Sequence, residues 1–344
     1  MKLQNLDIEK YKEHALGCLL GVACGDAMGM PTSMLSPDEI RNIFPERITS
    51  FLPAPEGHVI HNGMVAGQIT DDTQQAMILV KLFLEEGRIS RDGVARKLIE
   101  WGESLNAFDS LILGPSSLRA LKMIREGVPV DEAGYLGDTN GAAMRIAPIG
   151  VINPGNLQRT LKDVIEVCVP THNTNIAIAG ASAVACAVSA GMAGASLDEL
   201  IEAFFYGIKE GMAYDKKWFG ASLTHRTEWA LDIARSGKRE ETIWQDLYNY
   251  IGAGVAITEA VPTALALVVY YGGDPVRTIE AATNMGGDCD TVGAIAGGIA
   301  GAYSGAGNFP LEFLEKIEAI NNLHLNDHVS RLAERVLAGM EILK

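Results

Sequence analysis

Positive charge is scarce in this sequence. Lys and Arg together number 28, against 43 Asp and Glu, and the formal net charge is −15. Proteins that bind nucleic acid usually carry a basic surface that meets the phosphate backbone. The composition therefore argues against a nucleic-acid partner and leaves open a protein or small-molecule substrate.

Cysteine is also rare, and its positions do not suggest a disulfide framework. The five cysteines are an odd number, are widely scattered and stand mostly inside apolar runs. This pattern is typical of buried free thiols in a reducing compartment. Residues 1–14 are charged and lack the apolar core of a secretory signal. We therefore expect a cytoplasmic protein.

Charged residues are absent from one long stretch, residues 173–197. Its length would suffice to cross a bilayer. However, the stretch consists mainly of Ala, Gly, Ser and Asn, with few large apolar side chains. Such a composition favours a central helix that close neighbours bury on all sides. We therefore predict no membrane partner.

Strand-like alternation is scarce, whereas helical periodicity covers most of the chain. The best strand candidate is the short segment Arg47–Leu52. No Pro-rich or charged linker divides the 344 residues, so we predict a single all-α domain spanning 1–344. The expected helices cover residues 8–29, 37–44, 73–86, 93–104, 116–126, 174–194, 197–211, 227–236, 241–251, 261–272, 292–304 and 311–342, some of them broken.

Glycine recurs every four residues in two of the expected helices. One row comprises Gly17, Gly21, Gly25 and Gly29, and the other Gly293, Gly297, Gly301 and Gly305. A spacing of four places each row on one helix face. Glycine inside a helix costs about 0.5–1 kcal/mol relative to alanine, so each row needs a compensating gain. Close helix packing supplies one through dispersion contacts, and we expect both rows near the centre of the fold.

Two short acidic clusters lie near opposite ends of the chain. The first is Thr70-Asp71-Asp72-Thr73, and the second contains Asp288, Asp290 and Thr291. A helix start needs only one capping side chain, so capping explains neither pair of aspartates fully. Oxygen donors without a His or Cys pair beside them suit hard cations such as Mg²⁺, Mn²⁺ and Ca²⁺. The clusters predict a two-metal site at which the two ends of the chain meet.

The order of motifs resembles the ADP-ribosylglycohydrolase family. The matching segments are GDAMGMP at 25–31, TDDT at 70–73, GDTNGAAMRIAP at 137–148, TH at 171–172 and GGDCDTVGAIAG at 286–297. The resemblance implies an orthogonal all-α multi-helix bundle with two Mg²⁺ (or Mn²⁺) ions in a cleft. The metal ligands that it implies are Thr70, Asp71, Asp72, Asp288, Asp290 and Thr291.

The resemblance also implies hydrolysis of a glycosidic bond of ADP-ribose. Cleavage at the anomeric carbon passes through an oxocarbenium-like state, and metal ions can activate a water for attack. We expect Asp109 to assist that water, together with the ligand carboxylates Asp72 and Asp288. The alternative is that Asp109 merely caps the turn that follows it.

A glycine-rich segment and a histidine are the expected substrate contacts. Backbone N–H groups of small residues bind phosphates well, and the family uses this loop for the diphosphate or ribose. The resemblance therefore assigns substrate binding to Thr139, Asn140, Gly141, Ala142 and His172. For Arg145 we favour a structural carboxylate partner over a phosphate.

One position departs from part of the family. Some members carry a catalytic glutamate where this chain has Ser33, and a serine cannot act as a carboxylate base. The leading hypothesis is a Mg²⁺-dependent hydrolase acting on an ADP-ribosylated protein or an ADP-ribose-containing small molecule. The alternatives are a metal-dependent nucleosidase or other small N-ribosyl hydrolase, and a non-catalytic relative of the crystallin type.

Overall fold

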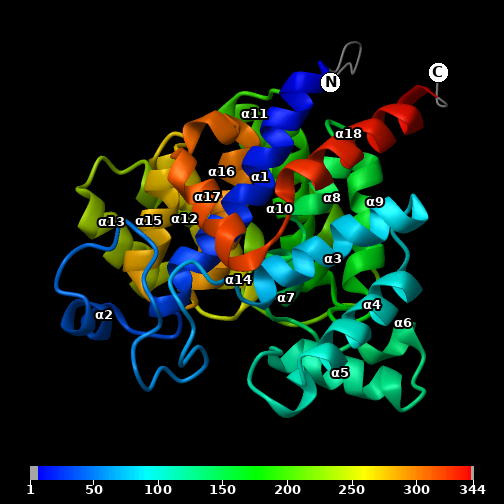
Figure 1. Ribbon diagram of the computed structural model, residues 1–344, viewed down its shortest axis with the longest axis horizontal. Coiled ribbons are helices and arrows are strands. Elements are labelled where there is room, and N and C mark those ends of the chain that lie inside the picture. The colour runs from blue at the N-terminus through cyan, green and yellow to red at the C-terminus, as the bar shows by residue number, and fades with distance from the viewer. Residues whose placement is uncertain (1–6, 342–344) are drawn as a thin grey trace.

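The protein is a bundle of helices (Figure 1), and its computed structural model describes residues 7–341. In this part of the chain β-structure is limited to two isolated bridges. The prediction of an all-α fold is confirmed. The α-helices are α1 (Ile8–Gly29), α2 (Pro37–Ile43), α3 (Asp71–Glu86), α4 (Arg91–Ser104), α5 (Pro115–Arg125), α6 (Val130–Ala133), α7 (Gly141–Met144), α8 (Ala147–Ile152), α9 (Leu157–Cys168), α10 (Asn175–Met192), α11 (Leu197–Met212), α12 (Leu223–Ala234), α13 (Glu240–Asp246), α14 (Ile257–Tyr270), α15 (Pro275–Met285), α16 (Cys289–Ser304), α17 (Leu311–Asn321) and α18 (Leu325–Glu341).

Helices α1 and α16 lie side by side through the centre of the molecule (Figure 1) and pack more extensively than any other pair within the described chain. The two glycine rows form this interface. A methyl group on Gly21 would stand 2.0 Å from the carbonyl oxygen of Gly297, and one on Gly297 would stand 2.2 Å from that of Gly21. The backbones therefore touch directly, as the spacing of the glycines predicts. This contact joins the first and last parts of the chain.

The charge-free stretch forms helix α10, and every residue of that helix is buried. By length and composition α1 and α10 could each cross a membrane, but 94% and 100% of their most apolar stretches are buried inside the protein. Helix α10 packs against α8, α9, α11 and α16. Its small side chains allow these neighbours to approach closely, so it serves as a core helix of the bundle.

Two expectations about local structure were wrong, one about a strand and one about two helices, and one expected helix is broken. Segment Arg47–Leu52 is not a strand, because its backbone has no strand beside it, and the Ile48 N–H and C=O bond instead to the side chain of Asn284. The last expected helix is two helices, α17 and α18, separated at Asn322, which adopts a left-handed backbone (φ 52°). Helices α9 and α15 were missed, although both have an amphipathic pattern.

A long segment without regular structure, residues 44–70, joins α2 to α3 and runs along the lower left of Figure 1. Side chains from distant helices anchor it. Asn321 of α17 accepts from the Ile69 N–H and donates to the Gly67 carbonyl, while His58 bonds through Nε2 to the Ser33 carbonyl at 3.0 Å. The segment is thereby held against the C-terminal end of α1, where it forms one side of a pocket.

Candidate active site

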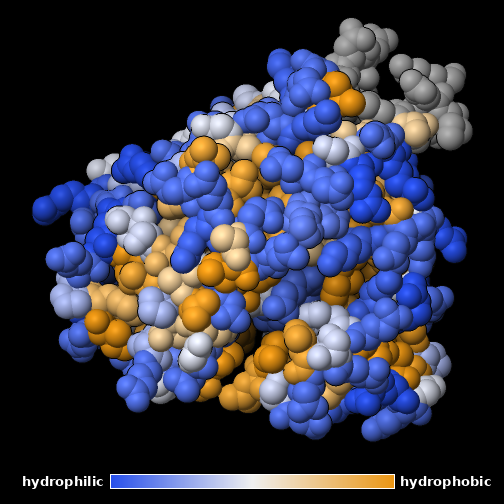
Figure 2. Space-filling view, in the orientation of Figure 1, coloured by the Kyte–Doolittle hydropathy of each residue, from blue (hydrophilic) through white to orange (hydrophobic). Residues whose placement is uncertain are grey.

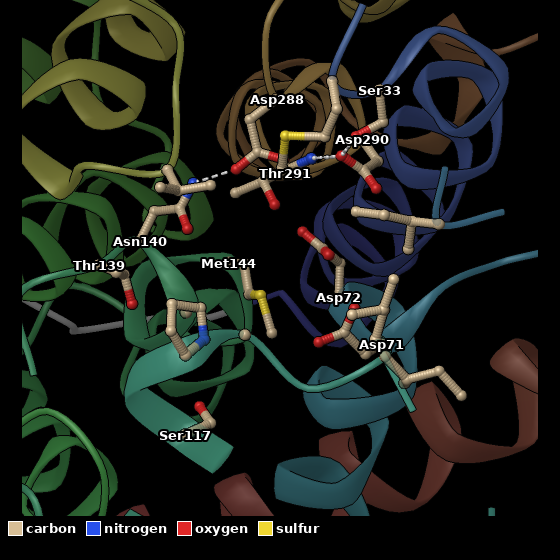
Figure 3. Close-up of a pocket in the computed structure, with 18 of the residues that line it drawn as sticks. Ser33, Asp71, Asp72, Ser117, Thr139, Asn140, Met144, Asp288, Asp290 and Thr291 are labelled. Carbon is tan, nitrogen blue, oxygen red and sulfur yellow. Dashed lines mark hydrogen bonds between the residues drawn. The ribbon is translucent and has the colours of Figure 1, made fainter. Parts of the chain in front are cut away.

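A pocket with a cavity volume of about 90 Å³ lies where the first and last quarters of the chain meet its middle part. The space-filling view is hollowed at its lower edge, between the 44–70 segment and α5 (Figure 2). The close-up shows two aspartate pairs facing a wall of hydroxyl and amide groups (Figure 3). The lining residues include Ser33, His61, Asp71, Asp72, Ser117, Thr139, Asn140, Gly141, Asp288, Asp290 and Thr291.

The first aspartate pair stands at the start of α3 because a buried carboxylate fixes that helix end. Thr70 is the N-cap. Asp26 of α1 accepts the backbone N–H of Thr70 and both the N–H and hydroxyl of Thr73, at 2.5–3.0 Å. The motif GDA therefore orients the motif TDDT, and Asp71 and Asp72 point into the pocket from the first turn of the helix (Figure 3). Asp26 therefore holds the start of α3 in place.

The second pair stands at the start of α16, after a glycine turn. Gly286 and Gly287 both have φ 93°, a conformation that side chains rarely adopt. Gly287 exchanges two backbone hydrogen bonds with Met34 and Leu35, and the Asp288 N–H donates to the Ala253 carbonyl. The turn thus ties the C-terminal motif to the end of α1.

Hydrogen bonds set the orientation of Asp290 and Asp288. Asp290 accepts from the Ser33 hydroxyl at 2.6 Å and contacts His61 Nε2 at 3.0 Å. Asp288 accepts from the Asn140 amide at 2.6 Å. Sequence reasoning missed His61. The available signal was the pair His58 and His61 shortly before the acidic cluster, and their rings stack in the structure at 5.1 Å.

The four carboxylates repel one another in a setting that water barely reaches. Burial and the neighbouring charge of Asp290 raise the pKa of Asp71 to about 7 and that of Asp72 well above its usual value. Burial and Asp290 likewise raise the pKa of Asp288. Burial opposes ionisation of Asp290 as well, but the hydrogen bonds from His61 and Ser33 outweigh it and lower its pKa to about 2.

This donor set fits divalent cations that prefer oxygen. Asp72 Oδ1 is buried and has no hydrogen-bond partner, although a buried carboxylate oxygen normally has one. A bound divalent cation would supply the missing partner and neutralise the cluster. Within residues 7–341 no three acidic or imidazole groups already form a closed cage, so an ion would have to draw the two pairs together.

Three of the expected substrate contacts line the opposite wall, and two lie behind it. Thr139, Asn140 and Gly141 reach the pocket, whereas Ala142 and His172 are fully buried. His172 contacts the Thr139 hydroxyl through Nε2 at 3.0 Å.

Arg145 differs from its expected role. It is fully buried, and it donates to the Gln75 side-chain oxygen at 2.8 Å and the Thr171 hydroxyl at 2.5 Å. The favoured carboxylate partner was therefore wrong.

Two further expected site residues lie outside the lining. Thr70 is buried as the cap of α3, and its hydroxyl donates to Asp72 Oδ2 at 3.3 Å. Asp109 is exposed at the end of a 3-10 turn, Ala107–Asp109, while Leu111 and Ile112 just after it reach the pocket. The metal-binding role of Thr70 and the catalytic role of Asp109 stay predictions.

The fold and the carboxylate pocket define a metal-dependent hydrolase that acts on glycosidic bonds, and comparisons with known proteins agree. The sequence profile of ADP-ribosylglycohydrolase matches residues 7–342, so the chain belongs to the ADP-ribosylglycohydrolase family. It is 36% identical to the uncharacterized protein YegU of Escherichia coli (strain K12), over 94% of this chain and 97% of that one.

A second relative has a named activity, and a solved structure shares the fold. The ADP-ribosylarginine hydrolase Tri1 of Pseudomonas putida (strain GB-1) is 25% identical over 95% of this chain and 79% of its own. The solved ADP-ribosylglycohydrolase-related protein complex superposes with a TM-score of 0.67 at 23% identity, over 95% of this chain and 98% of the other. The expected family and fold are therefore confirmed.

Proposed function

We propose that this protein is a Mg²⁺-dependent hydrolase that cleaves the glycosidic bond between ADP-ribose and an acceptor, either a modified protein side chain or a small molecule. One observation carries the proposal. Two pairs of aspartates, from the first and last quarters of the chain, face one pocket; Asp72, Asp288 and Asp290 are buried, and Asp72 keeps an oxygen without a partner. A wall of hydroxyl and amide groups faces these carboxylates across the pocket.

The carboxylate side of the pocket would hold two Mg²⁺ (or Mn²⁺) ions. Thr70, Asp71, Asp72, Asp288, Asp290 and Thr291 are the proposed ligands. When bound, such ions orient ribose hydroxyls and acidify a water molecule. We propose that the carboxylates of Asp72 and Asp288 also help to accept or return a proton at the reacting centre. Asp109 is proposed as a further catalytic carboxylate; it is exposed and lies two residues before Leu111, which lines the pocket.

The opposite side of the pocket would bind the rest of the ligand. Ser117 and Thr139 offer hydroxyls, and Gly141 offers a backbone N–H group at the start of α7, whereas the Asn140 N–H already donates to the Val255 carbonyl at 2.9 Å. One water molecule needs about 10–15 Å³ of cavity volume. A cavity of about 90 Å³ therefore has room for the ions, for the reacting ribose or for several waters. The remainder of an ADP-ribosyl group must therefore extend over the rim.

The direct test is release of ADP-ribose by the Mg²⁺-loaded protein. Peptides carrying ADP-ribosylated arginine or serine, and small ADP-ribose conjugates, are incubated with the protein and the products separated by chromatography. Asp72→Asn is expected to abolish release, whereas Asp38→Asn, on the exposed side of α2, retains it. Unchanged release by Asp72→Asn, or no release from any of these substrates, contradicts the proposal and favours a binding or structural role.

A metal-dependent nucleosidase is the second candidate, and two observations favour it. Ser33 stands where some relatives have a catalytic glutamate, and it holds Asp290 instead of offering a base. The small cavity volume, about 90 Å³, also suits a small ribosyl ligand better than a whole ADP-ribosyl group. Free nucleosides therefore belong in the same assay. Release of base from a nucleoside that lacks a diphosphate would support this candidate over the first.

We also propose that the protein acts in the cytoplasm. All five cysteines are buried and unpaired, which suits a reducing compartment. Fractionation of cells that express the tagged full chain tests the location, and recovery of the protein outside the cytoplasmic fraction would contradict it.

A further inference from the structure

A buried chain of hydrogen bonds connects the two walls of the pocket, and Arg145 lies at its centre. In one direction Arg145 Nη1 donates to Gln75 Oε1 at 2.8 Å, and Gln75 Nε2 donates to Asp71 Oδ2 at 3.0 Å. In the other direction Arg145 Nη2 donates to Thr171 Oγ1, which contacts His172 Nδ1 at 2.7 Å. His172 Nε2 then reaches Thr139 Oγ1 at 3.0 Å.

The direction of each hydrogen bond follows from the chemistry of the guanidinium. Arginine only donates, so the Thr171 oxygen must accept from Arg145. The Thr171 hydroxyl hydrogen then needs an acceptor, and among the described contacts the only one is His172 Nδ1. A nitrogen that accepts carries no proton, so the proton of the ring lies on Nε2.

The Nε2–H of His172 therefore donates to the Thr139 oxygen, which determines the hydrogen bond that Thr139 can make with a ligand. Its oxygen accepts from Nε2–H, so its own hydrogen is free to turn into the pocket that Thr139 lines. Burial and the nearby charges of Arg145 and Arg119 lower the pKa of His172, which keeps the ring neutral. A side chain at Gly141 would press on the ring at 3.0 Å, so the loop also restricts its orientation.

We propose that Arg145, acting through Thr171, fixes His172 as the Nε2–H tautomer, and that His172 thereby makes the Thr139 hydroxyl a donor to an oxygen of the bound ligand. His172 is a positioning residue, because Thr139 stands between it and the pocket. The ligand class rests on the proposed function, in which the diphosphate of ADP-ribose supplies acceptor oxygens. The same guanidinium orients Gln75 toward Asp71, so one buried cation organises both walls.

The tautomer is measured directly by NMR on protein labelled with ¹⁵N-histidine. The chain has seven histidines, and the signals of His172 are those lost in His172→Gln. The expected spectrum shows a protonated Nε2 and an unprotonated Nδ1, unchanged in Thr171→Ser and altered in Thr171→Val. A protonated Nδ1 with a bare Nε2 would overturn the proposal, because Thr139 would then have to donate to the ring.

Binding of ADP-ribose tests the consequence for the ligand. Thr139→Val is expected to weaken binding about tenfold, as loss of a hydrogen bond to a charged oxygen does, whereas Thr139→Ser stays within about twofold. In turnover the loss falls on KM while kcat holds, because Thr139 is not a reacting group. Wild-type affinity in Thr139→Val would overturn the proposal.

Substitutions at Thr171 distinguish a positioning role from direct ligand contact, because the Thr171 side chain does not line the pocket. Thr171→Val is expected to weaken ADP-ribose binding about threefold, with Thr171→Ser unchanged and Mg²⁺-induced stabilisation intact in both. Equal binding by Thr171→Val and Thr171→Ser contradicts the relay. If the unmodified protein binds no ADP-ribose, the proposed function fails, and the tautomer spectrum alone decides this inference.

Discussion

Substituting alanine for Gly21 should loosen the centre of the fold and the pocket together. Gly21 sits in the middle of the α1–α16 contact, and the new methyl group would stand 2.0 Å from the oxygen and 2.6 Å from the carbon of the Gly297 carbonyl. Real Cβ atoms essentially never approach closer than 3.0 Å. The helices must therefore separate by about 1 Å, because a backbone carbonyl cannot rotate away as a side chain does.

The magnitude follows from two opposing effects. Overpacking of this kind costs about 1–3 kcal/mol, and a clash with backbone belongs at the upper end. Alanine in a helix interior recovers about 1 kcal/mol relative to glycine. The free energy of unfolding should therefore fall by about 2 kcal/mol, which lowers Tm by roughly 4–8 °C at about 2–4 °C per kcal/mol.

Thermal unfolding with and without Mg²⁺ measures both consequences. Because α16 carries Asp290 and begins directly after Asp288, displacing it should also reduce the Mg²⁺-induced rise in Tm. The matched control is Gly307→Ala near the end of the same helix pair, where a methyl group meets only the flexible end of Glu13 at 3.1 Å. It should change Tm by less than about 2 °C. Equal Tm values for Gly21→Ala and the unmodified protein would refute the argument for close backbone packing.

Three further predictions concern the carboxylates. Asp72→Asn should abolish the rise in Tm with Mg²⁺ that mass action otherwise gives; a Mg²⁺ response of normal size counts against Asp72 as a ligand. In EDTA, Tm should fall between about pH 4 and pH 7, because burial and neighbouring charges raise the pKa of Asp26 to about 6 and of Asp71 to about 7. The native state then holds protons that the unfolded state has lost, so this stability is complete below about pH 4 and disappears as pH rises through 6–7; a flat profile contradicts the raised pKa values. Asp109→Asn should lower kcat about 100-fold, within the range of general acid–base catalysis, while the Mg²⁺-induced rise in Tm persists, and normal kcat would make Asp109 a residue of the rim only.

Sequence patterns predicted the parts of this fold that depend on periodic packing. The four-residue spacing of glycine predicted close backbone contact, and Gly21 and Gly297 make such a contact. The absence of charged residues from α10 predicted complete burial, and every residue of this helix is buried. Both signals are local in sequence and need no knowledge of the partner.

Features that depend on long-range pairing escaped prediction. Arg47–Leu52 alternates like a strand, but Asn284, far along the chain, supplies the hydrogen bonds that a neighbouring strand would have supplied. His61 carries no helical or strand pattern, and only the irregular path of residues 44–70 brings it to Asp290. We expected a carboxylate to pair with Arg145, yet its partners are an amide and a hydroxyl.

The pairing of α1 with α16 has a consequence for how the protein is made. Asp71 and Asp72 leave the ribosome roughly ten to forty seconds before Asp288 does, at about 5–20 residues per second. During that interval the nascent polypeptide contains Asp71 and Asp72 but lacks Asp288, Asp290 and helix α16, against which α1 packs. Catalytic competence must therefore arrive late in synthesis, and a chain that stops short of α16 should accumulate as an inert fragment.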